Sequence, residues 1–118
     1  MKEAVCQAID RRRDEIVGAG ESIMDQPELG FKEWQTADKV CAVFSHLGLS
    51  FENQLALTGV KARLNGGGNG PTVALMGELD ALVVPDHPRA NRQTGAAHAC
   101  GHNAQIAGLL GAAYGLVE

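Results

Sequence analysis

Residues 98–103 read His98-Ala99-Cys100-Gly101-His102-Asn103 and lead directly into a segment of mostly small or apolar side chains. The apolar positions of that segment are Ala104, Ile106, Ala107, Leu109, Leu110, Ala112 and Ala113. They occupy nearly every direction around a helix, and a helix that is apolar all round is normally buried inside a larger body. The stretch therefore predicts a buried helix that begins at a chemically reactive cluster.

The cluster itself contains one thiol and two imidazoles within five residues. Zinc prefers sulfur and nitrogen donors of this kind, so we interpret the cluster as half of a divalent-metal site. One alternative is a buried cysteine beside two ordinary histidines in a turn. Another makes Cys100 a nucleophile with His98 or His102 as its base, although such a base usually lies far away in the sequence.

A short apolar run, residues 72–76, precedes the cluster and is typical of a buried strand. It leads into Gly77-Glu78-Leu79-Asp80-Ala81-Leu82, where two carboxylates alternate at the end of the strand. Ligand-binding groups collect at the carboxyl ends of strands in α/β sheets, whereas the alternative role of these carboxylates is to solubilise the strand end. Residues 83–97, with two prolines, predict a long irregular loop.

Residues 60–64 alternate apolar and basic side chains and predict a half-buried strand. Together with residues 72–76, across the glycine-rich residues 65–71, they suggest a β-hairpin. A phosphate-binding role for the glycines is disfavoured, because no Lys-Ser/Thr follows them and the next predicted element is a strand.

Two amphipathic helices are predicted at the N-terminus. Lys2 to Met24 has apolar residues at helical spacing and must end before Pro27. A second helix begins near Phe31 or Lys32 and ends at Gly48, where a left-handed cap is expected. Its predicted buried stripe consists of Trp34, Ala37, Val40, Cys41, Phe44 and Leu47, and Cys6 is assigned to the core of the first helix.

Composition limits the classes of function. The chain has 118 residues, enough for one domain, and a net charge of −4 that offers no basic surface for nucleic acid. Three cysteines argue against a disulfide framework and suit a reducing compartment. Neither a signal peptide nor a membrane-spanning run is evident, so we expect a soluble cytoplasmic protein.

The order of three motifs carries a family resemblance. They are Gln26-Pro27-Glu28-Leu29-Gly30-Phe31-Lys32-Glu33, then residues 77–82, then residues 95–103. This order resembles the M20 family of metallopeptidases and amidohydrolases. Within it, the chain is most similar to the branch of N-acyl-amino-acid, auxin-conjugate, hippurate and aminobenzoyl-glutamate hydrolases.

The resemblance implies an α/β fold, part of a three-layer metallopeptidase-type catalytic domain. Residues 1–118 would form its N-terminal portion, with two helices, a β-hairpin region and a buried helix after the metal motif, while the lid or dimerisation domain and the C-terminal part are absent. Cys100 and His102 would bind a divalent metal, either zinc or manganese. The complete protein would hold two such ions. Asp80 would orient a ligand, and His98 would either supply a third ligand or orient the loop.

The implied reaction is metal-dependent hydrolysis of an amide in N-acyl or N-aryl amino acids or small peptides by metal-activated water. The family's general base, a glutamate, lies downstream of this chain, so the chain alone should bind metal weakly and be inactive. The complete protein is expected to be a homodimer without nucleic-acid or membrane partners. The fragment is expected to self-associate or aggregate through Leu109, Leu110 and Leu116. The alternative is a truncated or degenerate fragment that binds a metal or a partner without catalysis.

Three positions depart from the branch pattern. Asn103 and Gln105 stand where many members carry Asp and His. Asn103 has no charge, so it would support a neighbouring metal ligand more weakly than Asp. Glu78 occupies a position that is commonly Asp and preserves the acid.

Overall fold

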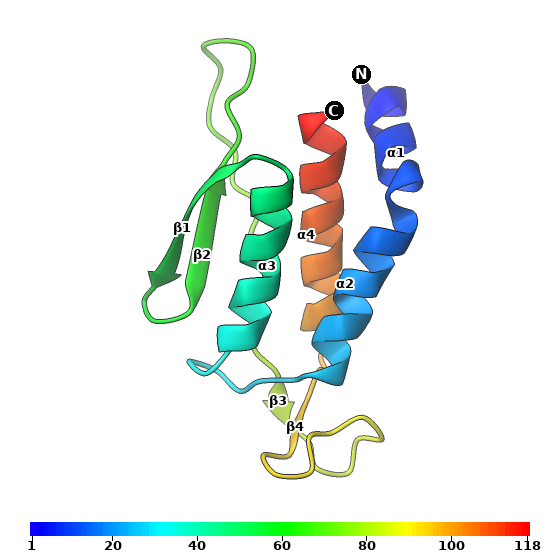
Figure 1. Ribbon diagram of the computed structural model, residues 1–118, viewed down its shortest axis with the longest axis vertical. Coiled ribbons are helices and arrows are strands. Elements are labelled where there is room, and N and C mark those ends of the chain that lie inside the picture. The colour runs from blue at the N-terminus through cyan, green and yellow to red at the C-terminus, as the bar shows by residue number, and fades with distance from the viewer.

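Helix α4 (His102–Val117) is the central helix of the computed structural model, which describes residues 1–118 (Figure 1). Helices α1 (Lys2–Arg11) and α2 (Arg13–Asp25) pack on one side of α4, and α3 (Trp34–His46) lies on the other. Strands β1 (Ser50–Leu55) and β2 (Gly59–Arg63) form one antiparallel pair, and β3 (Leu82–Val83) and β4 (Ala96–Ala97) form another. This mixture of helices and strands confirms the predicted α/β class.

The core lies between α2, α3 and α4. Its buried members are Ile23, Val40, Phe44, Ile106 and Leu110. These residues recur at helical spacing in the sequence, and each helix presents one apolar side to its neighbours. Central placement of the helix that follows the cluster is confirmed, but part of its surface stays open to solvent: Leu110 is buried and Leu116 is exposed. The expectation that Leu110 lies on an exposed apolar surface is therefore wrong.

The predicted single helix from Lys2 to Met24 is wrong, because the helix breaks at Arg12. Arg12 has φ −102° and ψ 12°, and its N–H donates to Ile9 O at 3.0 Å in a tight last turn. Its side chain forms ion pairs with Glu15 at 2.9 Å and Glu118 at 3.6 Å. The break lets both α1 and α2 follow the surface of α4.

Two residues assigned to the core are exposed. Trp34 is 48% exposed, because it is the first residue of α3 and helical side chains lean toward the N-terminal end, beyond the buried stripe. Cys6 is also exposed, and Cys41 is half-buried. The expected cap at Gly48 is confirmed by its φ of +68°.

The predicted hairpin between residues 60–64 and 72–76 is wrong. Strand β2 pairs instead with β1, with Ser50 opposite Arg63 and Phe51 opposite Ala62. The mainly polar sequence of β1 concealed this strand, since only Phe51 of its six residues is even partly buried. Residues 72–76 run extended with no strand partner, and all five are exposed, so the predicted buried strand is also wrong. Burial of a strand requires neighbouring strands, and residues 1–118 provide none here.

The irregular loop predicted between residues 83 and 97 is confirmed, with a short strand at each end. Leu82 pairs with Ala97, and Val83 pairs with Ala96. Arg89 holds the loop against α2 through ion pairs with Glu21 at 2.9 Å and with Asp25. None of the helices has the length and apolar character needed to cross a membrane.

Candidate metal centre

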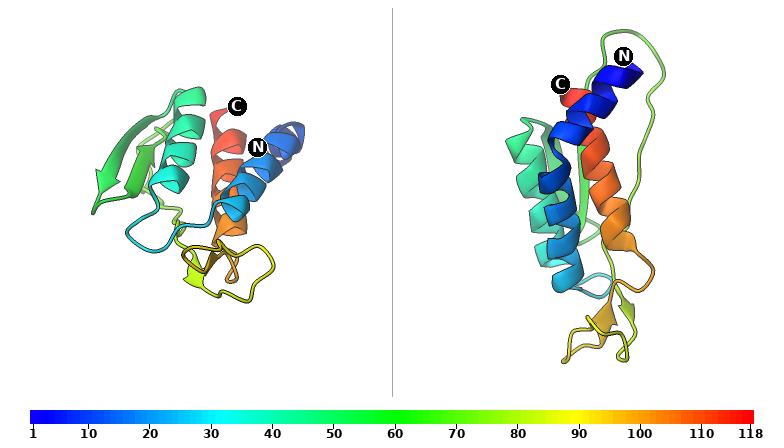
Figure 2. Two further views of the ribbon diagram at one scale, coloured as in Figure 1. Left: turned by 60° about the horizontal axis from the view of Figure 1, so that its bottom comes forward. Right: turned by 90° about the vertical axis from the view of Figure 1, so that its right-hand side faces the viewer.

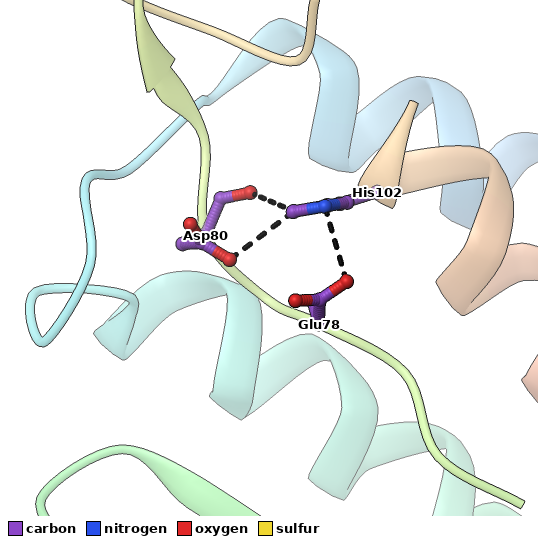
Figure 3. A group of neighbouring side chains, drawn as sticks. All are labelled: Glu78, Asp80 and His102. Carbon is purple, nitrogen blue, oxygen red and sulfur yellow. Dashed lines mark hydrogen bonds and ion pairs between the residues drawn. The ribbon is translucent and has the colours of Figure 1, made fainter. Parts of the chain in front are cut away.

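Three side chains from two distant parts of the sequence meet at the N-terminal end of α4. Glu78 and Asp80 lie on the extended segment that leads to β3, and His102 is the first residue of α4 (Figure 3). Alternate residues of an extended chain project to the same side, which brings both carboxylates to the helix. Gly101 has a φ of +88°, a conformation that favours glycine, and the helix begins directly after it.

Asp80 holds the imidazole of His102 on one side. Nδ1 of His102 lies 2.8 Å from the backbone oxygen of Asp80 and 3.1 Å from its Oδ1. Both atoms are acceptors, so Nδ1 carries a hydrogen and donates it. This contact fixes the orientation of the ring and leaves Nε2 as the nitrogen available for other partners.

Glu78 faces that remaining nitrogen. Its Oε2 lies 3.2 Å from Nε2 of His102. With Nδ1 carrying the hydrogen of a neutral ring, Nε2 and the carboxylate are both acceptors, and a proton or a cation must lie between them. Ligand atoms of the three side chains lie within 4.8 Å of one another, and one imidazole with two carboxylates is a suitable donor set for a divalent cation.

Helix α4 also positions the strand that carries the carboxylates. The backbone N–H of Glu78 donates to Oε1 of Gln105 at 2.6 Å. At Gly77, a Cβ would lie 2.8 Å from Cδ1 of Ile106, so the strand packs directly against the helix. In the sequence, Gln105 is visible only as a departure from the branch pattern. Its position one turn after His102, on the same side of the helix, is the signal that could have identified it.

A second support comes from the loop between α2 and α3. The backbone oxygen of Glu28 accepts the N–H of Ala81 at 2.7 Å, and Leu29 forms a parallel bridge with Ala81. The Glu28 carboxylate accepts hydrogen bonds from N–H and Oγ1 of Thr36, both at 2.8 Å. The loop is thereby fixed to the first turn of α3 on one side and to the residue after Asp80 on the other.

Glu33 stabilises the same loop from inside. It is buried, and its carboxylate accepts hydrogen bonds from the N–H of Phe31 at 2.9 Å and from Oγ1 of Thr58 at 2.7 Å. Phe31 has a φ of +62°, and its bond to Glu33 secures this turn. The motif at residues 26–33 therefore serves to position the segment that carries Asp80, a role of Glu28 and Glu33 that the sequence pattern alone does not reveal.

His98 is buried close to His102 and Asp80. It is 3% exposed, and neither ring nitrogen has a hydrogen-bond partner. Burial lowers the pKa of His98, and His102 lowers it further, whereas Asp80 raises it. His98 is therefore a neutral imidazole at neutral pH, with donor and acceptor capacity unused by the protein.

Asn103 is directed away from the site. Its Nδ2 donates to the backbone oxygen of Gly20 at 3.3 Å, which joins α4 to α2, and its Oδ1 has no partner. The expectation that Asn103 supports the neighbouring ligand is not met by this arrangement. An uncharged amide can donate to a carbonyl, which the carboxylate of Asp cannot do.

Cys100 is not part of the assembled group. Its thiol is exposed, and the group within mutual reach consists of Glu78, Asp80 and His102. Of the residues predicted from sequence, the structure thus brings together Asp80 and His102, adds Glu78, and places Cys100 outside. Metal ligation by Cys100 stays a prediction.

Comparisons with known proteins identify relatives of one kind. The chain is 38% identical to thermostable carboxypeptidase 2 of Saccharolobus solfataricus over 109 residues, which are 89% of this chain and 28% of that protein. It is 38% identical to IAA-amino acid hydrolase ILR1-like 5 of Arabidopsis thaliana over 89% of this chain and 25% of that protein. With N-acetyl-L-cysteine deacetylase of Bacillus subtilis the identity is 33%, over 88% of this chain and 26% of that protein.

No family model matches the chain, and no solved structure matches it. The chain spans about a quarter of the length of the curated relatives that it matches. The similarity nevertheless covers the three motifs and the whole candidate site, because it extends over nearly nine-tenths of the chain. The relatives that match nearly nine-tenths of this chain are M20-type amidohydrolases, and the chain matches about a quarter of the length of each.

Proposed function

We propose that the complete protein uses a divalent metal ion to hydrolyse an amide bond in N-acyl or N-aryl amino acids or in small peptides. Support comes first from the relatives, which are named as a carboxypeptidase, an IAA-amino acid hydrolase and an N-acetyl-L-cysteine deacetylase, all of them hydrolases. The observation that carries the proposal is the arrangement of His102, with Nδ1 held by Asp80 and Nε2 facing the Glu78 carboxylate at 3.2 Å.

The residues of this chain have distinct parts in the proposed site. His102 offers Nε2 as a metal ligand, and Asp80 keeps the hydrogen on Nδ1 and holds the ring in place. Glu78 adds an oxygen donor beside Nε2. We assign Cys100 as the soft ligand, because a thiolate adds charge and lies two residues from His102. A divalent ion in such a site acts as a Lewis acid and lowers the pKa of bound water.

The general base belongs, in this proposal, to a part of the protein beyond residues 1–118. The 118-residue chain then has only part of the ligand set and no base, so it should bind metal weakly and show no amide hydrolysis. This expectation separates the proposed hydrolase from the alternative, a fragment that binds a metal or partner without catalysis.

The test compares two products of the same reading frame. Metal content and amidase activity are measured, with and without a chelator, on the 118-residue chain and on any longer product. The proposal expects stoichiometric metal and chelator-sensitive activity in the longer product alone. Activity that survives complete removal of metal would contradict it. If no longer product exists and the chain shows no activity, the non-catalytic alternative is correct.

Two cysteine variants of the longer product test the assignment of Cys100. Cys100→Ala should remove most of the bound metal, since the thiolate is lost. Cys41→Ala is the matched control, because Cys41 is half-buried on α3 and burial raises the pKa of its thiol, which disfavours the thiolate that binds metals. Metal content should be unchanged in that control. Equal losses of metal from both variants would contradict the assignment.

A further inference from the structure

The extended segment that carries the two carboxylates lies against the first turns of α4 in a definite register (Figure 2, right). The N–H of Glu78 donates to Oε1 of Gln105 at 2.6 Å. Two residues later, the backbone oxygen of Asp80 accepts a hydrogen bond from Nδ1 of His102 at 2.8 Å. Two residues of an extended chain span about 6.6 Å, and three residues of a helix rise about 4.5 Å. The segment and one helical turn therefore match closely enough for both contacts to form together.

Glu78 is joined to this one turn of α4 at two points. Its backbone N–H is bound by Gln105, and Oε2 of its carboxylate lies 3.2 Å from Nε2 of His102. The Glu78 side chain is 65% exposed, so packing does not hold the carboxylate in place. A glutamate side chain that is free in solvent samples many rotamers, and ordering it costs conformational entropy. The position of the Glu78 backbone is what keeps its carboxylate within reach of the imidazole.

Gln105 is well placed to fix that backbone. It lies three residues after His102, on the same side of the helix. Its side-chain oxygen is engaged by the N–H of Glu78, so this oxygen is used for support and not for binding an ion. Gln105 is itself exposed, so its contribution to the helix core is small.

We propose that Gln105 is a positioning residue of the metal centre. By holding the backbone of Glu78, it keeps the Glu78 carboxylate beside Nε2 of His102, so that both groups bind one divalent ion. This inference rests on the proposed function and adds to it a residue that acts on the ion only through Glu78. Groups that hold metal ligands in this way typically change metal affinity by tenfold to a hundredfold when they are lost.

Mn²⁺ binding by the 118-residue chain tests the proposal, with the free ion measured by electron paramagnetic resonance. Gln105→Met keeps the length of the side chain and a good helix former but removes the oxygen that accepts the Glu78 N–H. It should raise the dissociation constant for Mn²⁺ by about tenfold or more. Gln7→Met is the matched control, because Gln7 is an exposed glutamine on α1, which lies toward the other end of α4 (Figure 1). It should leave the dissociation constant unchanged.

A double-mutant cycle with Glu78→Gln asks whether Gln105 acts through Glu78. Glu78→Gln removes the carboxylate charge, and it should weaken Mn²⁺ binding by itself. If the only role of Gln105 is to place that carboxylate, adding Gln105→Met to Glu78→Gln should raise the dissociation constant by less than about twofold. This lack of additivity is a result that a general loss of stability would not produce.

NMR of the metal-free chain provides a second measurement on the contact itself. The Glu78 amide should exchange with solvent more slowly in the wild-type chain than in Gln105→Met, because its acceptor is lost. The hydrogen on Nδ1 of His102 should be retained in both, since Asp80 holds it. Circular dichroism should show unchanged helix content, because Gln105 is exposed.

The outcomes separate this proposal from the proposed function. Wild-type Mn²⁺ affinity in Gln105→Met, or equal exchange of the Glu78 amide in both chains, would overturn the proposal and leave the metal site in place. A full additional loss of affinity when Gln105→Met is combined with Glu78→Gln would also overturn it, since Gln105 would then act independently of Glu78. A wild-type chain that binds no Mn²⁺ would contradict the metal site of the proposed function, and the proposal with it.

Discussion

The two halves of one extended run, residues 72–76 and residues 77–82, differ in how the chain holds them. The second half is bound on both sides, with Glu78 N–H on Gln105, the Asp80 backbone oxygen on His102, and Ala81 N–H on Glu28. The first half has no hydrogen bond to the rest of the chain and five exposed side chains. The chain thus builds a complete support for the candidate site and leaves the neighbouring strand edge open.

The largest expected contrast is in packing. Leu110→Ala removes a side chain that is 1% exposed and packed in the core with Ile23 and Phe44. It should lower the free energy of unfolding by about 3 kcal/mol, through lost burial and a residual cavity. Leu75→Ala makes the same chemical change in the open half and should alter stability by less than about 0.5 kcal/mol. Chemical denaturation of the two variants measures both values at concentrations where the chain is monomeric.

Comparable losses in the two variants would break this contrast. They would mean that Leu75 is covered in the monomer, which the open edge does not allow. A small loss for Leu110→Ala alone would mean instead that the contacts between α2, α3 and α4 do not stabilise the chain.

A smaller effect is expected at the loop that supports the site. Glu28→Ala removes the acceptor for the N–H and hydroxyl groups of Thr36 at the start of α3, and should cost about 1–2 kcal/mol, as loss of a helix cap does. Glu52→Ala is the control, because Glu52 is exposed and pairs only with Lys61 on the hairpin surface. It should leave the unfolding free energy nearly unchanged, because solvent screens an exposed ion pair. A Glu28→Ala variant as stable as Glu52→Ala would remove the structural role assigned to residues 26–33.

The smallest effect concerns the hydroxyl of Tyr114 on α4. Burial raises the pKa of Tyr114, and the hydrogen bond from its hydroxyl to Glu15 at 3.1 Å raises it further. The folded chain therefore holds this proton more tightly than the unfolded chain does. The resulting stability is present below the ordinary tyrosine pKa and is lost as pH rises through the raised value.

Ultraviolet absorbance can follow this titration directly, because the chain contains one tyrosine. Glu15→Gln should lower the pKa of Tyr114 toward its ordinary range, since the neighbouring carboxylate charge is removed. Glu52→Gln should leave it unchanged. An ordinary Tyr114 pKa in the wild-type chain would show that α2 and α4 do not pack closely in solution.

Patterns within single elements were sufficient to predict much of the fold. The second helix, the cap at Gly48, the loop after residue 83 and the final helix follow from spacing and turn chemistry, which are local properties. Arg12, where the helix breaks, pairs with Glu15 and with Glu118, which lies more than one hundred residues away, and helical spacing alone does not reveal such a contact. The exposure of residues 72–76 depends on which strands are available as neighbours, which no local pattern encodes.

The candidate site was predicted in part for the same reason. His102 and Asp80 belong to motifs that are visible in the sequence, and their contact follows from the meeting of a strand end with a helix start. The role of Gln105 in holding Glu78 depends on how the extended segment is positioned along the axis of α4, which the sequence does not specify. Motif spacing placed Cys100 with His102, but it could not show that the thiol lies outside the group of Glu78, Asp80 and His102.

The central claim is that His102, between Asp80 and Glu78, holds a divalent cation. Titration of the 118-residue chain with Mn²⁺, followed by paramagnetic broadening of its NMR signals, tests this claim most directly. We predict broadening centred on Glu78, Asp80 and His102 that is lost in His102→Gln and retained in His46→Gln, where an exposed histidine at the end of α3 is replaced. Broadening that is centred elsewhere, or that persists in His102→Gln, would contradict the account.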